Sequence, residues 1–184
     1  MATRLAWLLL AIALPLRAAE VAGVKFGDRA TVAGTELALS GAGLRERFIF
    51  DVYAIALYVK DPKADRVTQP GAKRVSIRML RDVDADTFSK ALVDGMRPNH
   101  DEATMKALEP QIAALTAIMA QMKEAKKGMA IELDWVPGAG TQVTVDGKPA
   151  GAPIAGEDFY PALLRIWLGP HPVQDGLKKA LLGA

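Results

Sequence analysis

The chain has 184 residues, of which 51% are hydrophobic and 24% charged, and these proportions predict a single globular domain. It has no cysteine, which excludes disulfides, thiolate zinc sites and cysteine nucleophiles. Its formal net charge of +2 comes from Arg4 and Arg17, so the rest of the chain is neutral and has no bulk attraction for nucleic acid.

The N-terminal residues predict a secretory signal peptide over 1–19. A short basic start over 1–4 precedes an apolar run over 5–16, and the small residues at 18 and 19 offer a cleavage site. The run is too short to span a bilayer comfortably, and an uncleaved N-terminal anchor is the alternative interpretation. We therefore expect a periplasmic or secreted domain over 20–184, with no transmembrane segment after cleavage.

The first half of the domain predicts strands. β-branched and aromatic residues dominate 48–59, and this run is apolar on both alternating sets of positions, as in a strand that is covered on both faces. Two prolines and a glycine mark 61–72 as a loop. The other strands in this half are predicted over 24–32, 35–40 and 74–80.

Helical periodicity begins at Asp84 or Asp86, either of which could cap a helix that ends at Gly95. A second helical region is predicted over 102–127, with Pro110 kinking it or starting a new helix. The order of elements predicts an α+β fold with an antiparallel sheet and helices on one face. The remaining predicted elements are strands over 129–136 and 141–145 and helices over 157–168 and 174–182.

Most catalytic and cofactor chemistry has no support in the sequence. His100 and His171 stand alone in proline-containing turns, which predicts surface histidines, because metal sites need clustered ligands. The alternating aspartates over 82–86 have the spacing that opens a calcium loop, but Thr87 occupies the position that requires glycine. No glycine-rich nucleotide-binding motif opens a helix. We expect no metal and no cofactor.

A glycine pair and two arginines precede the apolar strand. Arginine is the best bidentate partner for a carboxylate or phenolate and stays charged at any physiological pH, and a tyrosine hydroxyl can donate a second hydrogen bond to the same anion. A cation at the edge of an apolar surface suits a ligand with an anionic head and an apolar body. The alternative is that the arginines are solvent-facing strand residues beside Glu46 and Asp51. The candidate residues are Arg45, Arg47, Tyr53 and Tyr58.

Several short motifs in a consistent order resemble the chalcone isomerase-like family, in its bacterial secreted branch. The glycine pair and arginines over 41–47, followed by the Val-Tyr-Ala-Ile-Ala-Leu-Tyr-Val run over 52–59, are closest to the fatty-acid-binding branch. Trp-Val-Pro-Gly, Val-Asp-Gly-Lys and Ile-Trp-Leu-Gly segments follow over 135–138, 145–148 and 166–169. The resemblance covers nearly the whole domain and implies an open-faced β-sandwich with a hydrophobic cleft between sheet and helices.

The resemblance also implies site residues. In the isomerase branch the arginine stabilises an oxyanion as a chalcone closes to a flavanone, and this role carries to Arg45. In the fatty-acid-binding branch an arginine and a tyrosine hold the lipid carboxylate, and these roles carry to Arg45 and Tyr53. The isomerase has threonine at the position of Tyr53, a departure that favours binding over catalysis. Asn99 is a further candidate, for the isomerase's asparagine, without a motif of its own.

The spacing between Arg45 and Tyr53 poses a geometric condition. On one straight strand the two residues would lie about 26 Å apart, so they can share a head group only if the chain turns between them.

Our leading hypothesis is a non-catalytic periplasmic protein that binds a small amphipathic anion, either a fatty acid or a phenolic compound. Arg45 would pair with the head group and Tyr53 would donate a hydrogen bond to it, with Arg47, Tyr58 and Asn99 as further candidates. One alternative is an isomerase of the chalcone-to-flavanone type, in which Arg45 stabilises an oxyanion. The other is an envelope interaction protein without a ligand. The sequence leaves the oligomeric state open.

Overall fold

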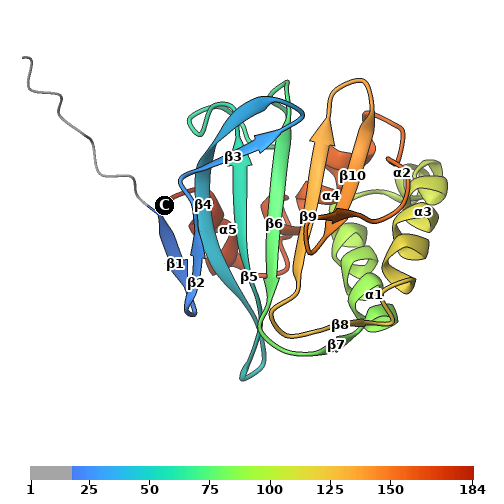
Figure 1. The fold of residues 1–184 in the computed structure, drawn as a ribbon. Helices are drawn as coiled ribbons and strands as arrows, with labels where there is room; N and C mark the ends of the chain where they lie inside the picture. Colours follow the sequence, from blue (N-terminus) through green and yellow to red (C-terminus); the bar gives the residue numbers. More distant parts are fainter. Residues whose placement is uncertain (1–17) are drawn as a thin grey trace, which may run out of the picture.

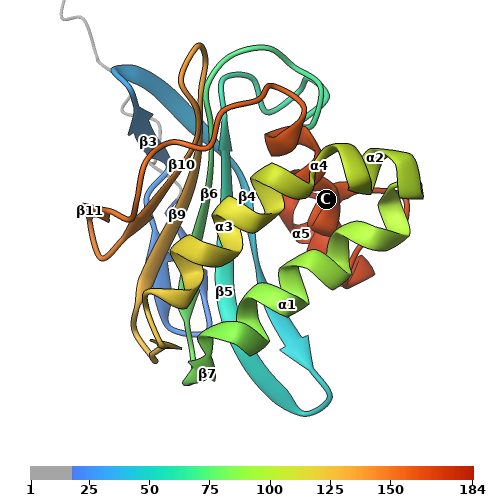
Figure 2. The ribbon, with the colours of Figure 1, turned by 90° about the vertical axis from the view of Figure 1, so that its right-hand side faces the viewer.

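The computed structural model describes residues 18–184, in which a curled antiparallel sheet carries helices on one face (Figures 1 and 2). Residues 1–17, which hold nearly all of the predicted signal peptide, lie outside the described residues. Seven strands form the main sheet in the order β11-β10-β9-β6-β5-β4-β3. They are β3 (Arg29–Val32), β4 (Thr35–Arg47), β5 (Phe50–Val59), β6 (Lys73–Met79), β9 (Ala130–Val136), β10 (Gly140–Val145) and β11 (Lys148–Pro149).

The helical layer lies on one side of the sheet when the sheet is viewed edge-on (Figure 2). Two short strand pairs, β1 with β2 and β7 with β8, complete the described elements. This arrangement confirms the predicted α+β fold. The helices are α1 (Ala85–Met96), η1 (Arg97–Asn99), α2 (Glu102–Ala107), α3 (Glu109–Ala120), α4 (Phe159–Leu168) and α5 (Asp175–Leu181), and the short strands are β1 (Ala19–Val21), β2 (Val24–Phe26), β7 (Val83–Asp84) and β8 (Glu124–Ala125).

Two predicted elements have different boundaries in the structure. The strand predicted over 24–32 is divided into β2 and β3. The helical region predicted over 102–127 ends at Ala120, because Lys123 adopts a left-handed backbone (φ 59°) and the chain then forms β8. Within that region α2 and α3 are separate helices, and Pro110 lies in the first turn of α3, where its missing N–H costs little.

The strand predicted over 35–40 continues through the glycine pair to Arg47. Gly41 and Gly43 lie where α5 packs against β4. A Cβ on Gly41 would overlap the carbonyl oxygen of Ala180, and one on Gly43 would lie 2.7 Å from the Leu177 side chain. Glycine inside a strand often marks such a close approach of another backbone. The glycine pair therefore permits helix packing and does not end the strand.

β5 separates two apolar clusters, because its side chains alternate between the faces of the sheet. Tyr53, Ile55 and Leu57 contact the cluster beneath the helices. Ala54 and Tyr58 contact a smaller cluster on the other face, which residues from β2 and β3 cover. The prediction that this strand is covered on both faces is therefore confirmed.

All three tyrosines of the chain are buried, and each hydroxyl has a hydrogen-bond partner. Tyr58 donates to a backbone carbonyl between β2 and β3 at 2.9 Å, and Tyr160 donates to a carbonyl of β9 at 2.8 Å. The Tyr53 hydroxyl accepts from the indole N–H of Trp167 at 3.0 Å. Burial raises the pKa of all three phenols, that of Tyr58 to about 12.

Exposed tyrosines have a pKa of about 10. We therefore expect the folded protein to release no tyrosine proton near that pH. Because the folded pKa values lie above the unfolded one, the tyrosines stabilise the fold fully below about pH 10. The contribution of Tyr58 is lost as the pH rises through about 12. Tyrosinate absorbance during an alkaline titration measures this, with the urea-unfolded chain as reference. One tyrosine ionising near pH 10 in the folded protein would contradict the prediction.

Candidate functional site

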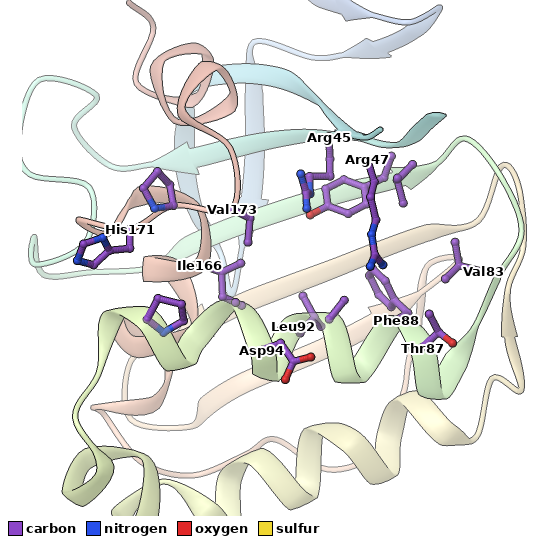
Figure 3. A pocket seen from close by; sticks show the side chains of 16 residues that line it. Arg45, Arg47, Val83, Thr87, Phe88, Leu92, Asp94, Ile166, His171 and Val173 are labelled. Atoms are coloured by element: carbon purple, nitrogen blue, oxygen red, sulfur yellow. The ribbon is translucent and has the colours of Figure 1, made fainter. Parts of the chain in front are cut away.

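A cavity of about 460 Å³ lies between the β4–β5 hairpin and α1, with α4 and the segment before α5 closing its far side (Figure 3). Its volume falls within the range of about 300–1,000 Å³ that is usual for small-molecule sites. Most of its walls are apolar, and they include Val52, Val83, Phe88, Leu92, Ile166 and Val173.

The hairpin meets the geometric condition that the sequence posed. Phe48 and Ile49 form a two-residue turn between β4 and β5. One extra residue on β5, Val52, then shifts the register, so that Arg45 lies directly opposite Tyr53. Directly opposite residues of an antiparallel pair have their Cβ atoms only about 5 Å apart. Both side chains therefore reach the same end of the cavity.

The alternation of β4 explains why its arginines face the cavity. Every second residue points to the helical face, so the glycine pair, Arg45 and Arg47 share that face. Figure 3 shows Arg45 and Arg47 extending from β4 toward α1. A register shift between Arg45 and Glu46 leaves Val52 as an extra residue on β5, and Val52 also lines the cavity. Such bulges commonly re-aim side chains beside a site.

Arg45 is half-buried and forms no ion pair within residues 18–184. Its Nη1 donates to the Glu46 carbonyl oxygen at 2.7 Å and to Gln174 Oε1 at 3.3 Å. By contrast, Arg74 on the other face of the sheet donates to both carboxylate oxygens of Asp134, at 2.7 and 2.6 Å. Arg45 therefore retains a charge that a ligand can neutralise.

Tyr53 lies at the base of the cavity and is almost fully buried. Its ring packs edge-on against Phe88, with centroids 6.2 Å apart. Burial raises its pKa, and the hydrogen bond from Trp167 and the charge of Arg45 oppose that shift only in part. The hydroxyl accepts from Trp167 and donates to no described residue, so its proton is available to an acceptor in the cavity.

Gln174, the residue before α5, fixes the backbone next to Arg45. Its Oε1 accepts from the backbone N–H of Glu46 at 3.0 Å as well as from Arg45, and its Nε2 donates to Glu46 Oε2 at 3.4 Å. The sequence interpretation assigned no site role to Gln174 or Trp167. Trp167 belongs to a segment that carried the family resemblance, but no local motif marks Gln174 as a neighbour of β4.

Two of the candidate residues do not line the cavity. Tyr58 is five positions from Tyr53 along one strand, so it points to the opposite face. Asn99 joins the end of α1 to the segment after α4: its Nδ2 donates to the carbonyl oxygens of Gly95 and His171 at 3.2 and 2.9 Å, and its Oδ1 accepts from the His171 N–H. Neither Tyr58 nor Asn99 therefore lies beside Arg45 and Tyr53 in this cavity.

Arg47 and His171 occupy the edge of the cavity. Both are exposed, and both line its mouth. His171 is an exposed residue outside the helices and strands, as predicted, and it also lines the cavity. His100 lies elsewhere, with its Nε2 3.1 Å from the carbonyl oxygen of Ala162.

Other predicted features serve the fold. Asp84 caps α1 by accepting from the backbone N–H of Thr87 at 2.9 Å, and Asp82 accepts from the N–H of Lys127. Within residues 18–184, no three histidine, aspartate or glutamate side chains gather as metal ligands. The helices of this part of the chain are too short or too polar to cross a membrane.

Comparison with known proteins places this geometry in a family. No curated protein matches the sequence. The crystal structure of a fatty-acid binding protein from Arabidopsis thaliana matches with a TM-score of 0.66 and 14% identity, covering 87% of this chain and 92% of that one, which shows that the two share a fold. A family profile described as chalcone isomerase-like matches residues 18–183. The chain therefore belongs to the chalcone isomerase-like family, as its motifs predicted.

Proposed function

We propose that the protein binds a fatty acid, or a similarly built amphipathic anion, in the cavity beneath the β4–β5 hairpin. The observation that carries this proposal is the position of Arg45, which is half-buried, forms no ion pair within residues 18–184 and points into an apolar cavity. A carboxylate would neutralise the charge of Arg45, and an acyl chain would cover the apolar walls.

The two head-group ligands are complementary. Arg45 offers a charged donor, and the Tyr53 hydroxyl offers a proton that no described residue accepts. Arginine and a hydroxyl can donate to the two oxygens of one carboxylate, and hydrogen bonds to a charged acceptor are the stronger kind. The fold shared with the Arabidopsis fatty-acid binding protein supports the same ligand class.

Binding without catalysis is part of the proposal. Arg45 and Tyr53 are hydrogen-bond donors, and burial keeps Tyr53 protonated at neutral pH, so neither residue supplies a base. The alternative of a chalcone-to-flavanone isomerase needs Arg45 to stabilise an oxyanion. A cyclisation rate above the buffer background that disappears in Arg45→Ala would favour the isomerase over a binding protein.

Replacing Arg45 with Gln tests the head-group role. Loss of one charge-assisted hydrogen bond, about 1.5–3 kcal/mol, should weaken palmitate binding by about tenfold to a hundredfold. Binding of the alcohol of equal chain length should change little, because the alcohol carries no charge. Isothermal titration calorimetry measures both affinities. Arg29→Gln, an exposed substitution on β3, is the matched control and should retain the affinity for the acid. Equal palmitate affinity in wild type and Arg45→Gln would refute the assignment.

Tyr53→Phe should affect both stability and binding. The buried Trp167 indole N–H would lose its acceptor, which should lower the free energy of unfolding by about 1–3 kcal/mol. In Trp167→Phe the donor is already absent, so adding Tyr53→Phe should cost less than it costs in wild type. Urea denaturation of the four proteins in this double-mutant cycle measures the coupling. Strictly additive losses would mean that the hydrogen bond does not stabilise the fold.

We further propose that residues 1–19 direct export and that the mature protein is periplasmic. The basic, apolar and small-residue segments of this region support the proposal. Expression of the full chain in a Gram-negative host should yield a periplasmic protein whose intact mass corresponds to cleavage near residue 19. A variant that lacks the leader should stay in the cytoplasm. A periplasmic or membrane-bound product that retains Met1 would identify an uncleaved anchor instead.

A further inference from the structure

The tip of the β4–β5 hairpin exposes three large apolar side chains. Phe48 is 90% exposed, Ile49 88% and Phe50 50%, and no other large hydrophobic residue of the described part of the chain is exposed to this degree. The hairpin extends past the neighbouring end of the sheet (Figure 2). Contiguous apolar side chains on such a projection indicate a surface that contacts an apolar phase or a partner.

The turn geometry does not account for these side chains. Phe48 adopts a left-handed backbone, with φ of 56°, in a two-residue hairpin turn. Such turns favour glycine, asparagine or aspartate, and a bulky residue with positive φ is a strained exception. The chain therefore places an aromatic residue and a β-branched residue at a position where neither local conformation nor core packing requires them. Strain of this kind concentrates at functional positions.

Two arginines surround the apolar tip. The guanidinium carbon of Arg81 lies 4.4 Å from the ring centroid of Phe50, and that of Arg47 lies 5.9 Å from the ring of Phe48. Guanidinium groups beside apolar rings suit a lipid interface, because the rings can enter the acyl region while the cations contact phosphates. Glu46 and Asp51 lie opposite each other in the same hairpin, and their negative charges offset those of the two arginines. Apolar insertion and not net charge would therefore drive the contact.

The tip is continuous with the mouth of the ligand cavity. A shallow groove of about 310 Å³ runs along Phe48, Phe50 and Arg81. It shares Arg47 and Val52 with the cavity, as well as residues of β7 and α1. A surface that covers the tip would therefore lie at the entrance through which a ligand reaches Arg45.

We propose that this hairpin tip inserts into the interfacial region of a phospholipid bilayer, with the cavity mouth facing the membrane. A projecting tip of three side chains is small for a stable protein interface, whereas a few apolar side chains with adjacent arginines suit a lipid surface. Docking stands independently of ligand identity. The consequence that an amphipathic ligand passes directly between bilayer and cavity rests on the proposed function.

Vesicle sedimentation tests the docking. The protein is residues 18–184, which hold the whole sheet and helical layer, because the apolar leader would itself bind lipid. Vesicles contain phosphatidylcholine alone or with phosphatidylglycerol. Replacing both Phe48 and Ile49 with Ser should weaken partitioning about tenfold or more on both vesicles, because the buried apolar area is lost. The matched control, Phe48→Leu with Ile49→Val, keeps the tip apolar and should remain within about threefold of the original.

Three results would overturn the proposal. These are no partitioning of the unsubstituted protein, equal partitioning of the Ser variant, and a dimer in sedimentation velocity that the Ser variant abolishes, which would make a second copy the partner. Palmitate affinity of the Ser variant in lipid-free solution should equal that of the original protein. Palmitate binding without vesicle binding would therefore refute docking and leave the proposed function intact. Vesicle binding without palmitate binding would support docking and refute the proposed function.

Discussion

The antiparallel pairing of β4 with β5 is the constraint on which the site depends. The two-residue turn and the one-residue bulge at Val52 together bring Arg45 opposite Tyr53. The alternation of both strands turns these two side chains toward the helices. The same alternation places the glycine pair against α5, which packs too closely on β4 for any side chain at these two positions. Because Gln174 immediately precedes α5, that residue can fix the Arg45 end of β4. One hairpin thus sets the position of a helix, a cation and a phenol.

The arginines on the two faces of the sheet differ in whether a carboxylate neutralises them. On the outer face, Arg74 and Arg78 are matched by Asp134 and Glu132, which joins β6 to β9 with the charges compensated. On the helical face, Arg45 has only neutral acceptors among the residues that the structure describes, so part of its electrostatic energy is left for a ligand. A half-buried cation without a counter-ion is costly in an apolar setting, and an anion that enters the cavity removes that cost. This contrast favours a binding site over a structural role for Arg45.

Sequence patterns located most elements, and their failures have physical causes. The alternation of β5 and the aspartate cap of α1 follow from local chemistry and were predictable. The strand predicted over 35–40 stopped before the glycine pair, yet the pair lies within β4. Only the packed α5 shows why side chains are excluded at these two positions. The true turn at Phe48 and Ile49 carries none of the residues that favour turns, so it was predicted as strand. Tyr58 was assigned to the site although its odd spacing from Tyr53 already places it on the other face.

The sequence by itself determined the α+β class, the family and Arg45 as a candidate, because periodicity, short motifs and a permanent charge are properties of local residues. It also supplied Tyr53, through the family resemblance. Only the tertiary structure decided that Arg45 and Tyr53 share one cavity, that Trp167 occupies the phenol's acceptor position and that Gln174 adjoins β4. These contacts join residues that are 114 and 129 positions apart in two cases, and no local pattern encodes such pairs. They arise when the helices pack on the sheet, which brings the polar side chains of α4 and of the segment before α5 against those of β4 and β5.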